Sequence, residues 1–361
     1  MLHAMTKPRI AATRARIATA SDVAELAGVS RSAVSRTFTQ GASVAPETRE
    51  KVMAAACQLK YRPNQMARSL MTRRSMIVAL AISHLDNQFY PPLVQAISEM
   101  LGAAGYRLLL YITHGDESHE PLLDELLRFG VDGLILASRG VAGELLAECD
   151  AAGLPVVMMN NAEASGQVPR VTGDNLQGSA RVARFLMAGG HRHYAYLAGI
   201  SGVSSSDERL LGYARELTGA GLPEPTVITG DFDFARSVAA TAQLLQSPGR
   251  PDALFCANDH MALAAIEAAR TCDLVPGRDL SVVGFDNVTI GQWSMLGLTT
   301  FSQSPQVMAA QVIELLAARI EGRALEEWAR IVPGQLILRD TARLPGQGIL
   351  TLPDGQRIWE G

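Results

Sequence analysis

The spacing of hydrophobic residues changes near residue 76 of this 361-residue chain. Before that point, apolar positions recur at the three- and four-residue intervals of short amphipathic helices. Beyond it, short apolar runs alternate with longer amphipathic stretches, a pattern typical of parallel strands joined by helices. The runs that predict buried strands are residues 76–82, 107–112, 133–137, 156–159, 193–199, 226–230, 253–257 and 281–285.

These strands predict a C-terminal α/β core of two doubly wound parallel-sheet subdomains. Residues 299–305 and 329–338 resemble further crossings between the two subdomains, so each would be discontinuous in sequence. Ligands of such sheets bind beyond the carboxyl ends of the strands, so polar residues in those loops are candidates for a site. Residues 349–359 predict a hairpin that turns at Asp354 and Gly355.

Residues 21–38 predict two short helices joined by a tight turn. Ser21 and Ser30 are placed to cap them, and Gly28 lies where the reversal needs a positive φ. A third helix begins at Pro46, a residue suited to a first helical turn. The residues expected in the shared core are Val23, Ala24, Leu26, Ala27, Ala33, Val34, Val52, Ala55, Ala56 and Leu59, with Phe38 filling the space left by Thr37.

The outer face of the second helix carries two arginines and two serines, at Arg31, Ser32, Ser35 and Arg36. Arginine pairs bidentately with guanine, and short hydroxyl side chains reach phosphates or base edges. This face therefore suits the major groove of double-stranded DNA. The alternative is an ordinary helical hairpin with a solvated basic face.

Charge is divided unevenly along the chain. Residues 1–75 hold 13 Lys and Arg against 4 Asp and Glu, a net charge of +9, whereas the rest carries −13. This division favours a nucleic-acid-binding arm on an acidic body, with residues 1–18 as a disordered basic extension. No apolar run reaches the roughly 18 residues of a membrane span, and residues 1–17 lack the apolar block of a secretion signal. We expect a cytoplasmic protein without a membrane partner.

Nothing in the sequence favours an enzyme, a cofactor or a metal site. The four cysteines form no CxxC pair and are expected to be buried, reduced thiols. His191 and His193 are spaced like metal ligands, but further ligands are missing, so packing at a strand edge is the favoured interpretation. The serine-rich segment 201–206 matches no nucleophile motif.

Several motifs together resemble the lactose-repressor (LacI/GalR) family of bacterial transcription regulators. They are DVAELAGVSRSAVSRTF, KVMAAACQLKYRPNQMARSL, CANDHMALAA and SVVGFDN, in consistent order over residues 19–342. The resemblance assigns base contacts to Arg31, Ser32 and Arg36 and a minor-groove wedge to Leu70, for which plain hinge packing is the alternative. It assigns contacts with the DNA backbone to Thr19, Ser30, Ser35, Thr48, Tyr61 and Asn64.

The resemblance also implies an effector pocket between the core subdomains. It makes Arg209 the residue that binds hydroxyls or a carboxylate and Phe232 the ring that packs on a sugar face. Two roles stay open for each of three residues. Asp259 either caps the following helix or contacts the ligand, and Asp174 either belongs to the crossover between the subdomains or contacts the ligand. Phe89 either lines the site or packs in the core. The implied ligand-binding residues are Ser83, Asp86, Phe89, Asp174, Arg209, Phe232, Asn258, Asp286 and Gln303.

The combined prediction is a homodimeric repressor that binds a pseudo-palindromic operator and responds to a sugar, sugar acid or polyol. The effector is expected to weaken operator binding. The alternative is corepression, in which the effector strengthens operator binding. A periplasmic sugar-binding protein is a second class, disfavoured by the DNA-binding arm. The expected domains are residues 19–62 for DNA binding, 63–75 for the hinge, 76–188 with 301–330 and 189–300 with 331–345 for the core subdomains, and 346–361 for a tail.

Overall fold

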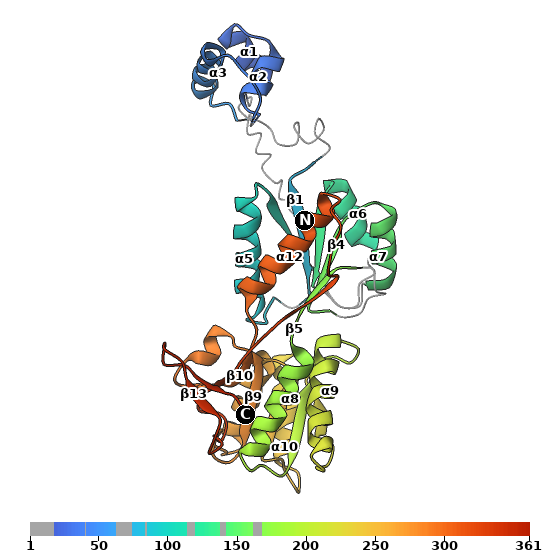
Figure 1. Cartoon of the computed structure of the whole chain (residues 1–361), viewed down its shortest axis with the longest axis vertical. Coiled ribbons are helices and arrows are strands. Elements are labelled where there is room, and N and C mark those ends of the chain that lie inside the picture. Colours follow the sequence, from blue (N-terminus) through green and yellow to red (C-terminus); the bar gives the residue numbers. More distant parts are fainter. Residues whose placement is uncertain are drawn as a thin grey trace, which may run out of the picture. The chain divides into compact units, whose positions relative to one another are not determined.

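The computed structural model describes residues 18–39, 41–62, 74–83, 85–113, 120–137, 142–161 and 168–361. The chain divides into two compact units, Met1–Ser75 and Met76–Gly361 (Figure 1). The expected basic extension and most of the expected hinge, with Asn64 and Leu70, lie outside the described residues.

The first unit contains the expected helices α1 (Ala20–Ala27), α2 (Arg31–Thr37) and α3 (Pro46–Gln58). Gly28 ends α1 with φ 66°, as expected, and Ser30 caps α2 by accepting the Ala33 N–H at 3.2 Å. The cap of α1 is Thr19 and not Ser21, because α1 begins one residue before Ser21. Asp22 completes this cap by accepting the Thr19 backbone N–H at 2.7 Å.

One expectation about the small core was wrong, whereas Phe38 packs against this core as expected. Leu26 is 47% exposed, because α3 and α2 pack against the side of α1 that carries Val23 and Ala24. Thr37 is itself buried, since its hydroxyl donates to the Ala33 carbonyl at 2.8 Å and so needs no outside partner.

The second unit consists of two α/β lobes. In the described residues of the first lobe, six parallel strands lie in the order β11-β5-β4-β3-β1-β2. Helices α5 and α12 pack together over one face, and α6 and α7 over the other (Figure 1). The bounds are β1 (Ile77–Ile82), α5 (Tyr90–Ala103), β2 (Arg107–Ile112), α6 (Glu120–Phe129), β3 (Gly133–Ala137), α7 (Ala142–Ala151), β4 (Val156–Met159), β5 (Arg170–Gly173), α12 (Pro305–Ile320) and β11 (Ala329–Val332).

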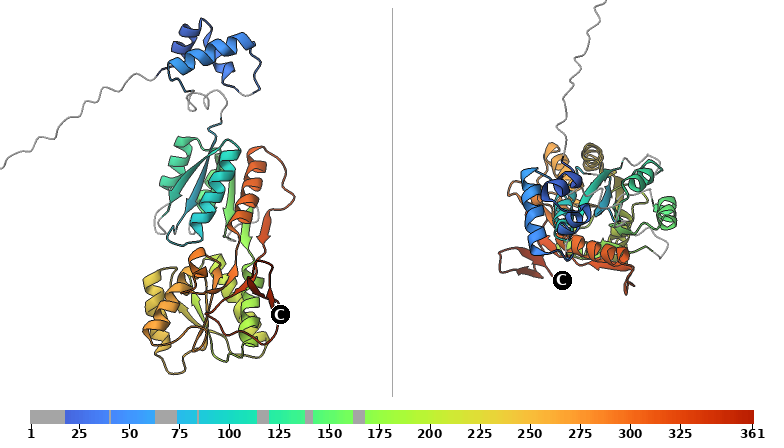
Figure 2. Two further views of the ribbon diagram at one scale, coloured as in Figure 1. Left: turned by 90° about the vertical axis from the view of Figure 1, so that its left-hand side faces the viewer. Right: turned by 90° about the horizontal axis from the view of Figure 1, so that it is seen from above.

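The second lobe is built on an eight-stranded sheet in the order β13-β14-β12-β10-β9-β8-β6-β7. Its helices pack in pairs, α8 with α9 and α10 with α11, and cover both faces (Figure 2). The bounds are α8 (Asn175–Ala188), β6 (Tyr194–Ala198), α9 (Ser204–Gly219), β7 (Thr226–Thr229), α10 (Phe234–Leu245), β8 (Ala253–Cys256), α11 (Asp259–Thr271), β9 (Ser281–Asp286), the 3₁₀ turn η1 (Thr289–Gln292), β10 (Thr299–Ser302), β12 (Leu336–Leu338), β13 (Ile349–Thr351) and β14 (Arg357–Trp359).

Three described segments cross between the lobes. The first crossing is 173–174, between β5 and α8, the second is 303–304, between β10 and α12, and the third is 333–335, between β11 and β12. The expected boundary at residue 188 was wrong, because α8 packs on α9, β10 and β12 of the second lobe. The boundaries expected at 300 and 330 are also displaced by a few residues, since β10 lies in the second sheet and β11 in the first.

The C-terminal segment belongs to the second lobe and is not a separate tail. Strands β13 and β14 form the expected antiparallel hairpin, and β14 pairs with β12. The Trp359 ring packs edge-on against Phe185 of α8, with ring centroids 5.8 Å apart. This contact explains why an indole near the chain end is buried.

Two further expectations can be compared with the structure. The cysteines are free thiols, but Cys57 is exposed on α3 and so differs from the expected buried state. Among the described residues, no helix combines the length and the apolar character that a membrane crossing requires.

Candidate functional site

The exposed face of α2 is the first candidate site. Arg31, Ser32, Ser35 and Arg36 are all exposed on it. Ser32 shares a hydrogen bond with Ser30 at 2.9 Å, and the Arg36 Nε–H donates to the Ser32 carbonyl at 3.4 Å. The helix is held by Arg49 of α3, which donates to the Thr37 carbonyl at 3.1 Å. The structure therefore presents the predicted base-reading side chains together on one rigid helix.

The residues expected to contact the DNA backbone lie around this helix and differ in how far their side chains are buried. Ser30 and Thr19 use their hydroxyl groups to cap α2 and α1. Thr48, in the first turn of α3, is half-buried, as is Tyr61, whose ring lies 5.7 Å from that of Phe38. Roles in DNA contact remain predictions for these four residues.

The second candidate site is a pocket between the two lobes of the core, with about 710 Å³ of empty space including its open mouth. Seven of the nine predicted ligand residues line it: Ser83 and Phe89 of the first lobe, Arg209, Phe232, Asn258 and Asp286 of the second lobe, and Gln303 of the second crossing.

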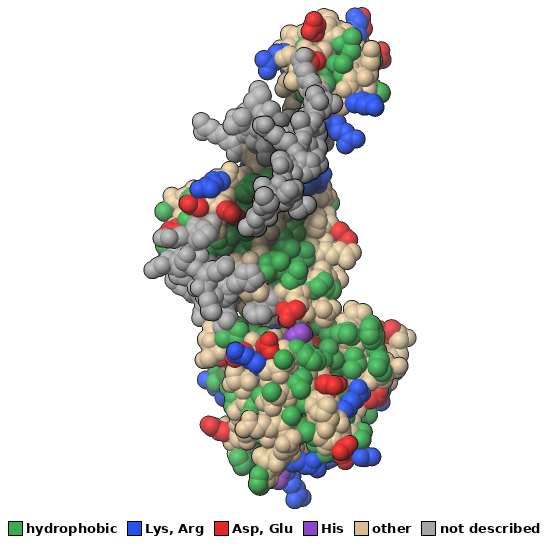
Figure 3. Space-filling view, turned by 180° about the vertical axis from the view of Figure 1, so that it is seen from behind, with side chains coloured by type: hydrophobic (Ala, Val, Ile, Leu, Met, Phe, Trp, Pro, Cys, Tyr) green, Lys and Arg blue, Asp and Glu red, His purple; other side chains and the backbone are tan. Residues whose placement is uncertain are grey.

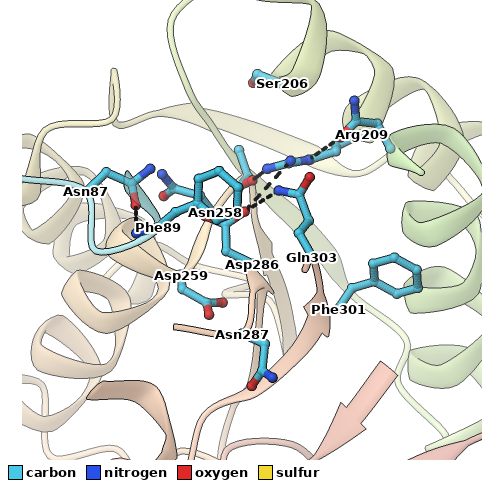
Figure 4. A network of polar contacts seen from close by, with 12 residues as sticks. Asn87, Phe89, Ser206, Arg209, Asn258, Asp259, Asp286, Asn287, Phe301 and Gln303 are labelled. Carbon is cyan, nitrogen blue, oxygen red and sulfur yellow. Dashed lines mark hydrogen bonds and ion pairs between the residues drawn. The ribbon is translucent and has the colours of Figure 1, made fainter. Parts of the chain in front are cut away.

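Arg209 is the most constrained side chain in the pocket. It is 3% exposed, and its guanidinium carbon lies 3.6 Å from the centre of the Phe285 ring. Its Nε–H donates to Asn175 Oδ1 at 2.9 Å, and Nη1 donates to the Ala257 carbonyl. Its Nη2 lies 3.9 Å from Asp286 Oδ1 (Figure 4). Two of the five N–H donors of this arginine are therefore hydrogen-bonded to the protein, and Nη2 faces the Asp286 carboxyl.

Asp286 is the anionic partner of that arginine. It is the last residue of β9 and has φ 132°, a strained value for a residue with a side chain. Burial raises the pKa of its carboxyl to about 7, although the nearby Arg209 acts in the opposite direction. Gln303 Nε2 donates to Asp286 Oδ1 at 2.6 Å. Above pH 7, where the carboxyl is ionised, the two charges of the pocket lining thus oppose each other.

Asp259 does not line the pocket. Its carboxylate accepts hydrogen bonds from the Thr300 hydroxyl at 2.6 Å and the Val288 N–H at 2.8 Å. Burial raises its pKa to about 6. The cap of α11 is Asn258, which accepts the Met261 N–H at 2.9 Å. Of the two roles considered for Asp259, the structure supports neither, because the side chain ties β10 and the segment after β9 to α11.

Two predicted ligand residues lie outside the pocket lining. Asp174 lies in the first crossing, in keeping with the crossover role considered for it, and it also caps α8 by accepting the Gln177 N–H at 3.3 Å. Asp86 is 66% exposed in its side chain and lies 3.7 Å from His260 Nε2 of the other lobe. It therefore spans the cleft beside the pocket instead of entering it.

Several further residues line the pocket that were not predicted from the sequence. Asn160 and Asn161 follow β4 directly, so the rule that polar residues after strands form the site applies to them as well. Ser205 lies in the serine-rich segment, which was considered only as a nucleophile. Asn87 and Tyr90 flank the start of α5 and carried no separate signal.

His191, considered above as a metal ligand, is buried beside Asp252, with His191 Nδ1 and Asp252 Oδ2 3.4 Å apart. Burial lowers its pKa. Within the described residues, no three His, Cys, Asp or Glu side chains gather as a metal site would require. The buried His191–Asp252 pair is therefore interpreted as a packing element at the start of β6.

Comparisons with known proteins cover both the helical unit and the α/β core. Residues 19–64 match the family "Bacterial regulatory proteins, lacI family", and residues 183–342 match the family "Periplasmic binding protein-like domain". The chain is 34% identical to the HTH-type transcriptional regulator CelR of Thermobifida fusca over 91% of this chain and 99% of that protein. It is 32% identical to the ribose operon repressor of Escherichia coli (strain K12) over 86% and 96%.

Solved structures show the same architecture. A lac repressor dimer bound to operator and an anti-inducer has a TM-score of 0.82 at 29% identity, covering 90% of this chain and 99% of that chain. A CelR–cellobiose complex has a TM-score of 0.69 at 32% identity, covering 90% and 100%. These matches confirm the expected fold class. The chain belongs to the LacI family of bacterial regulatory proteins, whose related members are transcriptional regulators and not enzymes.

Proposed function

We propose that this protein is a repressor that binds a pseudo-palindromic operator as a homodimer and changes its operator affinity when a neutral sugar occupies the core pocket. The observation that carries the proposal is the Arg209–Asp286 pair in a pocket lined by aromatic and amide side chains. A sugar acid, a sugar and a polyol were all open on the sequence alone. The charge balance of the pocket favours the neutral ligands.

The argument for a neutral ligand rests on electrostatics. A carboxylate or phosphate needs unpaired positive charge or free N–H donors when it leaves water. Arg209 already faces Asp286, Asn175 and the Ala257 carbonyl, and the described lining contains no other cation. An anionic ligand would therefore meet a cation whose charge is largely compensated.

Two acceptor atoms of the pocket lining favour a ligand that donates hydrogen bonds. Asn160 Oδ1 and Gln303 Oε1 are buried acceptors with no hydrogen-bond partner among the described residues. Hydroxyl groups of a sugar can donate to such acceptors, and the Phe89 and Phe232 side chains supply apolar surface for a sugar ring. CelR has been solved with cellobiose, and another relative is named for the ribose operon. Both names support a sugar in this pocket.

The DNA half of the proposal rests on α2. We assign base contacts to Arg31, Ser32 and Arg36 and contacts with the DNA backbone to the neighbouring predicted residues. Phosphate contacts would set affinity on any sequence, whereas the arginines would set discrimination among base pairs. Because this activity needs the chromosome, we place the protein in the cytoplasm.

A homodimer matches the two-fold symmetry of a pseudo-palindromic operator. Hydrophobic side chains form part of the surface of both lobes (Figure 3). Among the exposed ones are Ile112 at 48%, Trp293 at 55% and Met295 at 67%. Large apolar groups left in water are frequent at protein interfaces. We therefore infer that a partner subunit covers part of this surface.

The experiment is selection of DNA from a randomised duplex pool by the full-length protein at moderate salt. The selection is repeated with neutral sugars, the corresponding sugar acids, and polyols. We expect an enriched palindrome whose recovery changes with a neutral sugar and not with its acid, and the direction of change gives the sign of regulation. No enriched sequence would refute operator recognition, and a response to acids alone would refute the ligand class.

A further inference from the structure

The three crossings between the lobes are hydrogen-bonded to one another. The Asp174 N–H of the first crossing donates to the Val332 carbonyl at the start of the third, at 3.1 Å. At the second crossing, the Ser302 N–H donates to the Gln335 carbonyl at 2.8 Å, and the Gln335 N–H donates back to Ser302 Oγ at 2.9 Å. A force on any one crossing is therefore transmitted to the others.

Gln303 lies at the centre of this arrangement and is 5% exposed. Its side chain packs directly on the first crossing, because a β-carbon at Gly173 would overlap Gln303 Oε1 and lie 2.8 Å from its Cδ. The absence of a side chain at residue 173 is thus what makes room for the amide. Gln303 contributes to the second crossing by its backbone and contacts the first by its side chain.

The same amide is attached to the ligand pocket through Asp286. The Gln303 Nε2 donates to Asp286 Oδ1 at 2.6 Å, and the Gln303 backbone N–H donates to the Asp286 carbonyl at 3.2 Å. Figure 4 shows the Gln303 amide directed towards Asp286 and the Arg209 guanidinium. Asp286 lines the pocket, so a ligand hydroxyl group can reach the same carboxylate that holds the Gln303 amide.

We infer that Gln303 is the positioning residue that couples the pocket to the crossings. When the pocket is empty, the amide is fixed between Asp286 and the backbone at Gly173. A sugar hydroxyl that takes over Asp286 Oδ1 releases Nε2, and the amide and the second crossing then adopt a new position against the first. The lobes reorient because the three crossings move together. This inference rests on the proposed function, since it describes how that same pocket regulates DNA binding.

The test compares wild type with Gln303→Leu, which keeps a branched side chain one atom shorter and removes both polar atoms. Cellobiose, D-ribose and D-glucose are the sugar probes. Operator affinity is measured with and without each sugar, and sugar affinity is measured separately by calorimetry. Allosteric coupling in proteins is typically about 5- to 150-fold. We expect the coupling of the variant to fall below about 3-fold at sugar concentrations that calorimetry shows to saturate it.

A second variant reaches the same contact from the other side. Gly173→Ala introduces a methyl group where the Gln303 amide lies and changes no polar group, so it should also reduce coupling. Gly102→Ala is the matched control, because a β-carbon at that position in α5 meets nothing within 4 Å. The double variant Gly173→Ala with Gln303→Ala should regain the stability that Gly173→Ala alone loses, since the overlap is removed.

A readout without sugar separates this inference from the proposed function. Backbone amide hydrogen exchange at Asp174, Ser302 and Gln335 should accelerate in Gln303→Leu, because the crossings lose their common support. Unchanged exchange at these amides, or full coupling in Gln303→Leu, would overturn the inference. Loss of sugar binding together with coupling would make Gln303 a simple ligand contact. If wild type shows no coupling with any sugar, the proposed function fails, and the exchange measurement still decides the role of Gln303.

Discussion

Replacement of Arg209 by methionine is the sharpest test of the charge balance in the pocket. The change removes a buried cation, its hydrogen bonds to Asn175 and the Ala257 carbonyl, and its contact with the Phe285 ring, and it leaves Asp286 unpaired. Breaking a buried ion pair by removing one partner costs about 3–5 kcal/mol. We expect the free energy of unfolding to fall by about that amount at pH 8.

The loss should depend on pH in a defined direction. Burial raises the pKa of Asp286 to about 7 with Arg209 present, so the pKa should rise further once the arginine is gone. A carboxyl with a higher pKa in the folded state binds more protons when folded, so its unfavourable contribution is absent at low pH and grows as the pH rises. The difference between variant and wild type should therefore grow as the pH rises above 7 and be larger at pH 8 than at pH 5.5. It should shrink as the pH falls through 7, where Asp286 becomes neutral in both proteins.

Urea unfolding at pH 5.5 and pH 8 measures this difference. Arg184→Met is the matched control, because Arg184 forms a half-exposed pair with Glu216, with an Nη1–Oε2 distance of 3.4 Å. Exposed pairs contribute about 1 kcal/mol or less, so the control should lose little and lose it equally at both pH values. A loss in Arg209→Met that is the same at pH 5.5 and pH 8 would refute the assignment of Asp286 as the group left unpaired.

Three further variants test separate parts of the molecule. Arg36→Ala should lose about 1–3 kcal/mol of discrimination at one operator base pair, measured as binding to single-base variants of the site, and uniform weakening on all sequences would contradict a base-reading role. Gly199→Ala should weaken sugar binding by about 1–3 kcal/mol without changing operator affinity, because its β-carbon would overlap the Phe232 ring. Trp359→Ala should destabilise the second lobe by about 3–5 kcal/mol in urea unfolding, since it empties the space beside Phe185; a loss below about 1 kcal/mol would show that the hairpin is not integral to the lobe.

The sequence was sufficient for the features that depend on local patterns. Alternating apolar runs place the buried strands, and Gly28 marks the turn of the first two helices because a positive φ there excludes most other residues. Strand β5, by contrast, was missed, because Arg170–Gly173 contains a single aliphatic residue, Val171, and therefore forms no apolar run. The domain boundary expected at residue 188 was wrong for a different reason. The apolar pattern of an amphipathic helix such as α8 does not indicate which of two neighbouring sheets the helix covers.

Side-chain direction was the main quantity that the sequence did not contain. Asp286, Asp259 and Asp86 all lie at the ends of strands or in the loops that follow them, yet they have three different partners. Asp286 faces Arg209 and Gln303 in the pocket, and Asp259 turns to Thr300 behind it. Those partners are supplied by segments distant in the chain, so only the assembled fold decides which carboxylate meets which donor.

Asp86 extends this argument from the pocket to the movement of the lobes. It lies across the cleft from His260, with 3.7 Å between Asp86 Oδ2 and His260 Nε2, and at 66% exposure such a pair contributes little on its own. Gln303, in contrast, joins the pocket to two crossings through a buried amide. A contact in solvent can form and break at little cost as the lobes move, whereas the loss of a hydrogen bond by a buried amide costs free energy. Control of the lobe orientation is therefore better assigned to the crossings than to the mouth of the cleft.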